Sequence, residues 1–506
     1  MAWLKMATAS CIAGMLSLGT LAADPASAPE NRILSAAEIA EDIAIAQEAY
    51  ERIHPGYTRF TSAEAMRGSW ESLIAQANAD EGMSLGGFYV ESNRVLAGIR
   101  CDHTKAELPD VMAEKRKTVP VYLPMRWELI EGRGFVSIAG DETGLMRGDE
   151  ILAVDGQALS ERVDEILPLI PFDGQTEWAR DGQVAQSLEF RGGGLDHFGA
   201  LLFETGPTAD LTIQRGDEAP KVVTVERITH PEWLDLGAGQ TGARNFKDAI
   251  RFQRIGESAA YLAVDTFVNY RQPVKPDTLY DPIFKALKDE GRETLIVDLR
   301  RNGGGSDDAS LRLAAHLMSE KAAFKKDIRV KTLKMDGLED YLWTWDSRAM
   351  NPNPMGFKKN SDGTYSLRKM VSDDLKQVKP DRTAFEGQLI LLTSAANSSG
   401  STHLLAFIKD QNPDAILIGE RTGGNAEGAT AGILFTLTLP NSGIKMRVPA
   451  MQTFMNIESF TPGLGVSPDI ETPMTVQAFL DGTDPAYEKA LSLIETSTDF
   501  DTAALD

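Results

Sequence analysis

The segments "TLIVDLRRNGGGSDD" (Thr294–Asp308) and "LILLTSAANSSGSTHLLAFIKD" (Leu389–Asp410) decide the fold. Each is a short apolar run that ends in small or glycine residues and is followed by a helical pattern. Such runs are typical of buried parallel strands whose carboxyl ends open into a site. Strands and helices alternate from Arg251 onward. The sequence therefore predicts an α/β fold with a largely parallel sheet.

Both runs end in residues suited to acyl transfer. Gly303–Gly305 would let backbone N–H groups approach a ligand closely. The second run ends in a turn with three serines, Ser398, Ser399 and Ser401, any of which could present a nucleophilic hydroxyl or cap the following helix. A serine nucleophile beside an oxyanion hole is the equipment of an acyl-transfer enzyme.

These segments resemble one known family. "DLRRNGGG" is similar to the "DLRxNxGG" segment of the C-terminal processing (tail-specific) serine peptidases, and "SSGSTHLLAFIKD" followed by "AILIGERTGG" resembles their nucleophile helix and next strand. The resemblance covers roughly Arg251–Thr472 and implies a crotonase/ClpP-like catalytic core, which we place at residues 245–480. It implies Ser399 as the nucleophile, with Ser398 as the alternative, and the amides of Gly400 and Gly304 as the oxyanion hole.

The general base departs from the main family pattern. The resemblance would place a lysine at position 425, where this chain has Asn425, and an amide cannot take a proton. The enzyme is then either inactive or uses another base. "RCDHTKAEL" (Arg100–Leu108) resembles the signature of the tricorn-like Ser/His branch, which implies His103 as the base. His403, one helical turn after Ser399, is a rival.

A third residue would orient the histidine. The resemblance suggests a glutamate, and Glu458 is the nearest candidate, with Glu427 and Asp102 as alternatives. We interpret Cys101 as a buried packing residue and not as a nucleophile. The sequence has no pair of ligands at metal-binding spacing, so it predicts no metal and no cofactor.

The rest of the chain divides by pattern. Residues 31–110 are predicted to be helical, with capping boxes at Ser35–Glu38 and Thr61–Glu64. "GLMRGDEILAVDGQAL" (Gly144–Leu159) resembles a PDZ segment, so 115–230 is predicted to be a PDZ-like domain with an insertion at Pro168–Phe198; an unrelated β domain is the alternative. Lys325–Glu386 is interpreted as a flap or a surface insertion, and 481–506 as a C-terminal helix and tail.

Composition and the N-terminus limit the partners. The net charge of −23 argues against nucleic acid as a partner. Residues 1–23 read as a signal peptide whose apolar run is too short to span a membrane, which predicts a periplasmic or secreted protein. Its removal would leave Cys101 as the only cysteine, so no internal disulfide is expected.

Together these features predict a secreted serine peptidase that cleaves peptide or protein substrates, recognised through their C-termini. The alternatives are a non-catalytic peptide-binding protein on the same fold, motivated by the missing lysine, and a hydrolase of small esters.

Overall fold

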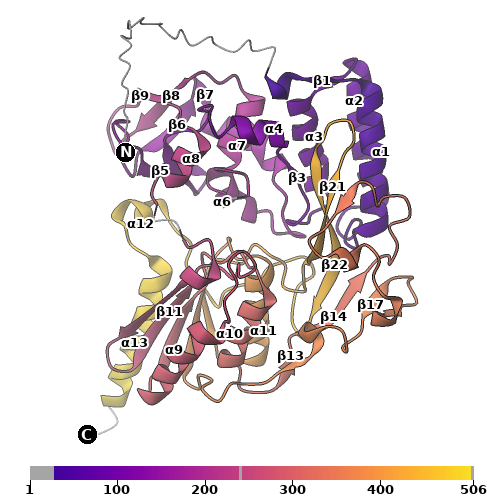
Figure 1. The fold of residues 1–506 in the computed structure, drawn as a ribbon. Helices are drawn as coiled ribbons and strands as arrows, with labels where there is room; N and C mark the ends of the chain where they lie inside the picture. The colour runs from indigo at the N-terminus through magenta and orange to yellow at the C-terminus, as the bar shows by residue number, and fades with distance from the viewer. Residues whose placement is uncertain (1–27, 188, 239–241, 503–506) are drawn as a thin grey trace, which may run out of the picture.

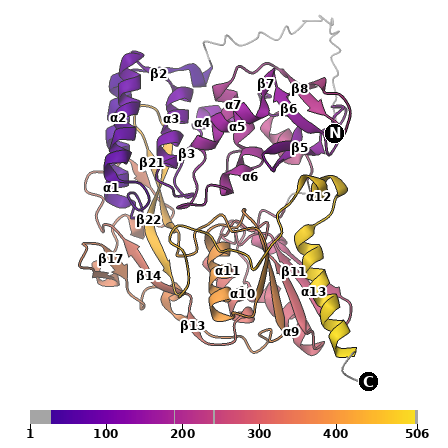
Figure 2. The same cartoon turned by 180° about the vertical axis from the view of Figure 1, so that it is seen from behind.

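The computed structural model describes residues 28–187, 189–238 and 242–502, so the predicted signal peptide at 1–23 lies outside the described residues. The N-terminal half of the chain forms the upper part of Figure 1 and the α/β sheet forms the lower left part. A long hairpin, β21–β22, reaches from the lower part to the N-terminal helices in both views (Figures 1 and 2). None of the described helices has the length and apolar character needed to cross a membrane.

The α/β sheet has the predicted parallel strands. Its order is β10-β11-β12-β19-β20-β23, and only β10 is antiparallel to its neighbour. The strands are β10 (Ile250–Ile255), β11 (Ala259–Val264), β12 (Thr294–Asp298), β19 (Gln388–Thr393), β20 (Ile416–Gly419) and β23 (Ile470–Glu471). The associated helices are α9 (Asp277–Asp289), α10 (Asp307–Leu317), α11 (Ser399–Gln411) and α13 (Pro485–Thr502). The expected mixed α/β class is confirmed.

Side-chain alternation explains why β12 and β19 are apolar along their lengths. Leu295 and Leu391 point to the face packed by α9, α10 and α11. Ile296 and Ile390 point to the opposite face, where they meet the start of α13. Because both faces of the sheet are covered, neither strand needs a polar side.

A second sheet incorporates the predicted 325–386 insertion. Its order is β15-β21-β22-β14-β17-β16, and β3 also pairs with β22. The strands are β14 (Lys325–Val330), β15 (Leu342–Trp343), β16 (Phe357–Lys359), β17 (Tyr365–Leu367), β21 (Thr430–Thr438) and β22 (Lys445–Met455), and β13 (Ala322–Ala323) pairs separately with β18 (Gln377–Val378). The first strand of the insertion is thus an integral part of a sheet, while Trp343 and Trp345 are exposed.

Residues 125–226 form an antiparallel sheet in the order β4-β5-β6-β8-β9. Ile151 and Val154 are buried and Asp155-Gly156 turns the chain between β6 and β7, as the sequence predicted. The strands are β4 (Met125–Ile130), β5 (Arg133–Ala139), β6 (Glu150–Val154), β7 (Gln157–Ala158), β8 (Thr208–Gln214) and β9 (Lys221–Glu226). The helices are α5 (Leu159–Ile166), α6 (Ala179–Ala185), α7 (Gly194–Leu202) and α8 (His230–Asp235).

The N-terminal region contains the expected helices. They are α1 (Ala36–Ile53), α2 (Ala63–Ala79), α3 (Leu85–Ala97) and the short α4 (Asp110–Lys115), with strands β1 (Ile33–Leu34), β2 (Met83–Ser84) and β3 (Ala106–Glu107). The Ser35–Glu38 capping box is confirmed. The Thr61–Glu64 box is wrong: Ser62 caps α2 by accepting from the Ala65 amide, while Thr61 donates to Gly98 O.

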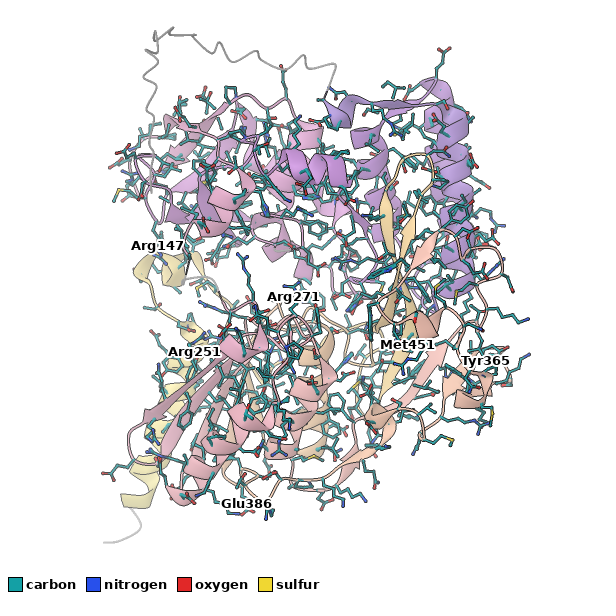
Figure 3. All side chains as sticks on the ribbon, in the orientation of Figure 1. Arg147, Arg251, Arg271, Tyr365, Glu386 and Met451 are labelled. Carbon is teal, nitrogen blue, oxygen red and sulfur yellow. The ribbon has the colours of Figure 1, made fainter. Side chains whose placement is uncertain are left out.

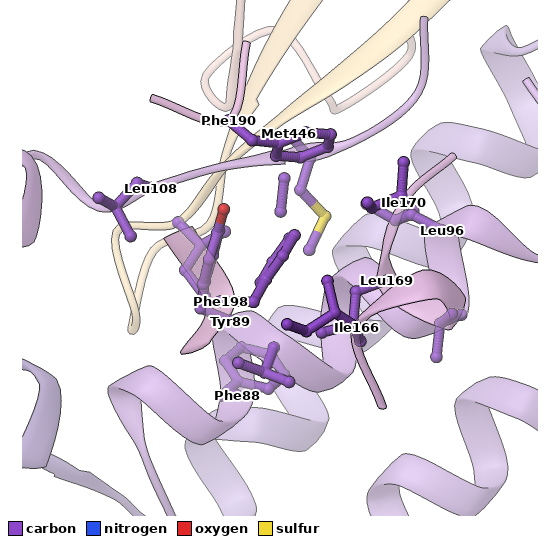
Figure 4. Packing of buried hydrophobic residues seen from close by; sticks show 14 of the residues in the cluster. Phe88, Tyr89, Leu96, Leu108, Ile166, Leu169, Ile170, Phe190, Phe198 and Met446 are labelled. Atoms are coloured by element: carbon purple, nitrogen blue, oxygen red, sulfur yellow. The ribbon is translucent and has the colours of Figure 1, made fainter. Parts of the chain in front are cut away.

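One hydrophobic core joins these N-terminal parts to the hairpin. Figure 4 shows Phe88 and Tyr89 of α3 packed with Phe198 of α7 and Met446 of β22. The side chain of Tyr50 also donates to Arg447 O (3.0 Å). The loop that follows α3 carries His103. This loop is therefore held in place by the core in which α3, α7 and β22 pack together.

The C-terminal end links the two halves. Arg147, labelled in Figure 3, donates to Phe479 O (2.5 Å) in α12 (Val476–Asp481), and its guanidinium lies 4.2 Å from the Phe479 ring centre. Phe479 also packs with Ile130 and Phe135 of the antiparallel sheet. Because α13 follows directly and packs on the α/β sheet, this segment connects the two sheets.

Candidate active site

The serine turn is a sharp strand-to-helix connection. β19 ends at Thr393, and α11 begins at Ser399. Ser399 has φ of 47°, in the left-handed region that a non-glycine residue adopts at a cost. A serine on such a turn projects its hydroxyl beyond the end of the sheet, as in the nucleophile elbow of α/β-hydrolases. Its hydroxyl makes no hydrogen bond to the part of the chain that the structure describes.

The other two serines have partners. Ser398 occupies the N-cap position but does not cap α11; its hydroxyl donates to Asp102 Oδ2 instead. Ser401 Oγ donates to Asn302 O and is buried. The three candidates therefore differ in environment, and Ser399 is the one whose hydroxyl is left without a partner among the described residues.

Two turns that contain glycine, one at Gly304 and one at Gly424, pack closely against the serine turn. A Cβ on Gly304 would lie 2.8 Å from Ser398 O and 2.9 Å from Gly400 N, and a Cβ on Gly424 would lie 2.9 Å from Ser398 Cα. Gly304 also has φ of 100°. Only glycine permits backbone to approach this closely. Asn397 strengthens this packing, since its side chain donates to Leu299 O (2.5 Å) and its carbonyl accepts from the Gly424 amide (2.8 Å).

The glycine turn beside Ser399 offers a different amide from the one expected. The Gly304 N–H donates to Asn302 Oδ1 (2.8 Å), which occupies it in this structure. Gly305 N lies 3.7 Å from the position of a Cβ on Gly400, and among the described residues its N–H has no acceptor. The Gly400 N–H lies in the first turn of α11, where helix geometry provides no acceptor. Gly305 and Gly400 thus present the amides best placed to bind an oxyanion.

Asp102 connects the histidine loop to the serine turn. Its Oδ1 lies 2.5 Å from His103 Nδ1, while its Oδ2 accepts the hydrogen bond from Ser398. Thr104, next in the loop, bonds through Oγ1 to the buried His54 Nε2 (2.9 Å). The structure therefore brings the predicted base next to the serine turn, although His103 and Ser399 make no direct hydrogen bond. Such bonds are often long before a substrate binds.

The electrostatics of the loop favour an ion pair. Burial alone would lower the pKa of His103, but the adjacent Asp102 carboxylate raises that pKa well above its usual value. Burial opposes ionisation of Asp102 as well, and the His103 imidazolium outweighs it and lowers the pKa of Asp102. The Asp102 carboxylate therefore stabilises the protonated imidazole of His103 relative to a histidine in water.

The predicted third residue lies elsewhere. The Glu458 amide donates to Asp410 Oδ1 (2.7 Å). Asp410 lies near the far end of α11, and at 1.5 Å per residue it is about 16 Å along the helix axis from Ser399. Glu427, an alternative, pairs with Arg59 (2.6 Å). Asp102, the other alternative, lies in direct contact with His103.

Two further residues have structural partners. His403 is buried, its Nε2 accepts the Ala429 N–H (3.1 Å), and burial lowers its pKa to about 3. Asn425, at the position of the family lysine, accepts the Gly428 N–H through Oδ1 (3.1 Å). Both side chains are engaged by backbone amides, so these hydrogen bonds do not direct either of them toward the candidate nucleophiles.

Asp173 also lies beside the histidine loop, although nothing in the sequence indicated it. Its Oδ1 accepts the Asp102 N–H (3.2 Å), and burial together with the neighbouring Asp102 charge raises its pKa to about 8. It lies in the predicted insertion of the antiparallel domain, which also donates from Thr176 Oγ1 to Gly423 O (2.5 Å). The segment "PFDGQ" has no motif that would indicate the contact of Asp173 with the histidine loop. Donor atoms of Cys101, Asp102, His103 and Asp173 all lie within 4.8 Å of one another, so these residues could hold a metal ion.

Comparison with known proteins agrees with this architecture. Residues 258–472 match the model of peptidase family S41. The structure of mature CPAF complexed with lactacystin is similar with a TM-score of 0.63 and 16% identity, over 92% of this chain and 98% of that one. The crystal structure of mature CPAF gives 0.61 and 15%, over 88% and 94%. No curated protein matches the sequence.

The matched segment contains the parallel strands, both glycine turns and the serine turn. The chain is a serine-type peptidase, and thus a hydrolase. Residues 258–472 carry the match to peptidase family S41, and the similarity to mature CPAF extends the shared fold over most of the chain.

The close approach of the glycine turn to the serine turn gives a mutational prediction. Gly304→Ala places a methyl group against Ser398 O and Gly400 N and should displace the turn. We expect kcat/KM for peptide cleavage to fall about 100-fold or more, comparable to the loss of one oxyanion donor. Gly303→Ala is the matched control, because its nearest contact would be Ala396 O at 3.8 Å. Equal activity of the two variants would contradict the packing argument.

Proposed function

We propose that this chain hydrolyses peptide bonds by acyl transfer, with Ser399 as the nucleophile and His103 as the general base. Asp102 orients His103 through Nδ1, which leaves Nε2 to accept the serine proton. The amides of Gly400 and Gly305 bind the oxyanion. The observation that carries the proposal is the Asp102 carboxylate, which contacts both His103 and Ser398, the residue before the nucleophile.

The steps follow from these roles. His103 takes the Ser399 proton as Oγ attacks the substrate carbonyl carbon, and the two amides stabilise the negative oxygen that forms. The imidazolium then protonates the leaving amine, so the C–N bond breaks and an acyl-enzyme remains. Water, deprotonated by the same imidazole, hydrolyses the ester and restores Ser399.

Two finer assignments belong to this proposal. The α/β sheet with its covering helices is proposed to be a crotonase/ClpP-like core. Residues 115–230 are proposed to be a PDZ-like domain that binds the substrate C-terminus, in the manner of strand addition to a sheet edge. The buried Ile151 and Val154 and the tight turn at Asp155-Gly156 support the second assignment.

The nucleophile is tested by covalent labelling. A fluorophosphonate probe should label wild type at Ser399, and Ser399→Ala should abolish both labelling and peptide cleavage with little change in melting temperature. Ser398→Ala is the control, and it should keep the labelled site. Peptides with an amidated C-terminus should be cleaved less efficiently than free acids if the C-terminus is recognised. Undiminished cleavage by Ser399→Ala would move the assignment to Ser398.

The base is tested by pH dependence in metal-free buffer. His103→Gln should lower kcat/KM by about 10²- to 10⁴-fold, the usual worth of general-base catalysis. Only neutral imidazole accepts the proton, so the raised pKa of His103 predicts activity that rises with pH through a midpoint above the ordinary histidine value of about 6.5. Asp102→Asn removes the charge that raises this pKa and should move the midpoint to lower pH.

His403→Gln is the matched control for this experiment, because glutamine can still accept the Ala429 N–H. It should keep the wild-type pH profile. If neither histidine variant changes turnover, and wild type cleaves no unfolded protein or peptide, the chain is a non-catalytic binding protein on this fold. Turnover of small esters alone would favour the ester-hydrolase alternative.

We further propose that the protein is periplasmic or secreted, on the sequence of residues 1–23. The basic Lys5, the apolar stretch and the small residues that follow are features of a cleaved signal. N-terminal sequencing of protein released by osmotic shock should begin near Ala23 or Asp24. Recovery of unprocessed chain from the cytosol would refute the proposal.

A further inference from the structure

Four donor side chains gather beside the proposed base. Cys101, Asp102 and His103 come from the loop after α3, and Asp173 comes from the loop before α6. The donor atoms lie within 4.8 Å of one another, a spacing that one ion could bridge. Cys101 is 4% exposed and Asp173 is 2% exposed, while Asp102 and His103 are partly buried, so the cluster has a buried base and an accessible side and is not a patch of surface acids.

One of the potential ligand atoms, Asp173 Oδ2, lacks a hydrogen-bond partner in the described part of the chain. Asp173 Oδ1 accepts the Asp102 amide, but Asp173 Oδ2 is buried and has no hydrogen-bond partner among the described residues. A buried carboxylate oxygen without a partner costs free energy, and native structures seldom leave one unsatisfied unless a water or an ion completes it. Asp102, adjacent to Asp173, adds a second carboxylate to the same small volume. The cluster therefore has the character of a cation site.

The donor set selects the class of ion. A thiolate, an imidazole and carboxylate oxygens suit zinc and similar borderline divalent ions, which bind four such ligands tetrahedrally. Calcium and magnesium require mostly oxygen ligands in larger number. Sequence spacing could not reveal the set, because Asp173 is separated from the other three ligands by about seventy residues and approaches them only in the fold.

We propose that Cys101, Asp102, His103 and Asp173 bind one Zn²⁺ ion, and that the ion inhibits the peptidase reversibly by occupying the imidazole of His103. On binding, the thiol and any protonated ligand release protons to solvent as the metal–ligand bonds form, and no electron is transferred. The binding claim stands on the cluster alone. The inhibition claim rests on the proposed role of His103.

Binding is tested without activity. Ser399→Ala protein, freed of metal by a chelator, should bind one Zn²⁺ per chain in calorimetry, and zinc should raise its melting temperature by linkage. Co²⁺ in place of zinc should produce the near-ultraviolet charge-transfer band of a thiolate ligand. Cys101→Ala in the same background should remove that band. Absence of the band in correctly folded protein overturns the proposal without reliance on any further variant.

Affinity variants locate the site. Changes around a metal's ligands already cost about 10- to 100-fold in affinity, so Cys101→Ala and Asp173→Asn should each weaken zinc binding about 100-fold or more. His230→Gln removes a histidine of α8 outside the cluster and should leave the affinity unchanged. Circular dichroism confirms folding of each variant. Equal affinity in Cys101→Ala, Asp173→Asn and His230→Gln overturns the assignment.

Inhibition is tested on wild type with a peptide substrate. Zinc should abolish cleavage at the concentration that saturates the calorimetric site, and a chelator should restore it. Each variant is compared with its own metal-free rate, and Asp173→Asn should need about 100-fold more zinc for the same inhibition, matching its loss of affinity. Zinc binding with full residual activity overturns the inhibitory claim. Zinc binding to a chain that never cleaves peptides refutes the proposed function and leaves the metal site standing.

Discussion

The site depends on the parallel register of β12 and β19. Thr294 pairs with Gln388 and Asp298 with Leu392, so the two strands end side by side. The chain must then leave both strands at one edge of the sheet, and the glycine turn meets the serine turn there. The side chain of Asn397 holds the two turns together, because it donates to Leu299 O and Asn302 O in the neighbouring segment. The strained φ of Ser399 is tolerated because these contacts over-determine it.

The sequence predicted the parts of the site that are local. The apolar runs, the glycine triplet and the serine turn are contiguous, and their periodicity and composition report directly on strands, turns and helices. His103 was predicted as the base only through a family signature, since a lone histidine in a loop carries no periodic signal. Asp102 was kept as an alternative third residue because it is adjacent to that histidine.

The parts that sequence reasoning missed depend on tertiary contacts. Glu458 was favoured by its position in the chain, but the geometry of the segment after β22 holds its backbone at the far end of α11. Asp173 reaches the site because the insertion that carries it docks onto Gly423 and Gly463 through Thr176 and Gln175. Nothing in a linear pattern encodes that docking. Likewise, the choice between the amides of Gly304 and Gly305 is made by one side chain, Asn302.

The proposed mechanism also changes the role of the N-terminal half. The S41 match covers residues 258–472 and includes Ser399, but His103, Asp102 and Asp173 all lie before it. With Asn425 engaged by the Gly428 amide, the matched segment has no base at the family position. In the proposed mechanism the base comes from a loop held by the hydrophobic core in which α3, α7 and β22 pack together. Under this proposal catalysis requires the two halves to remain docked, and a substitution in that core, far from any reacting atom, would impair the enzyme by moving His103 relative to Ser399.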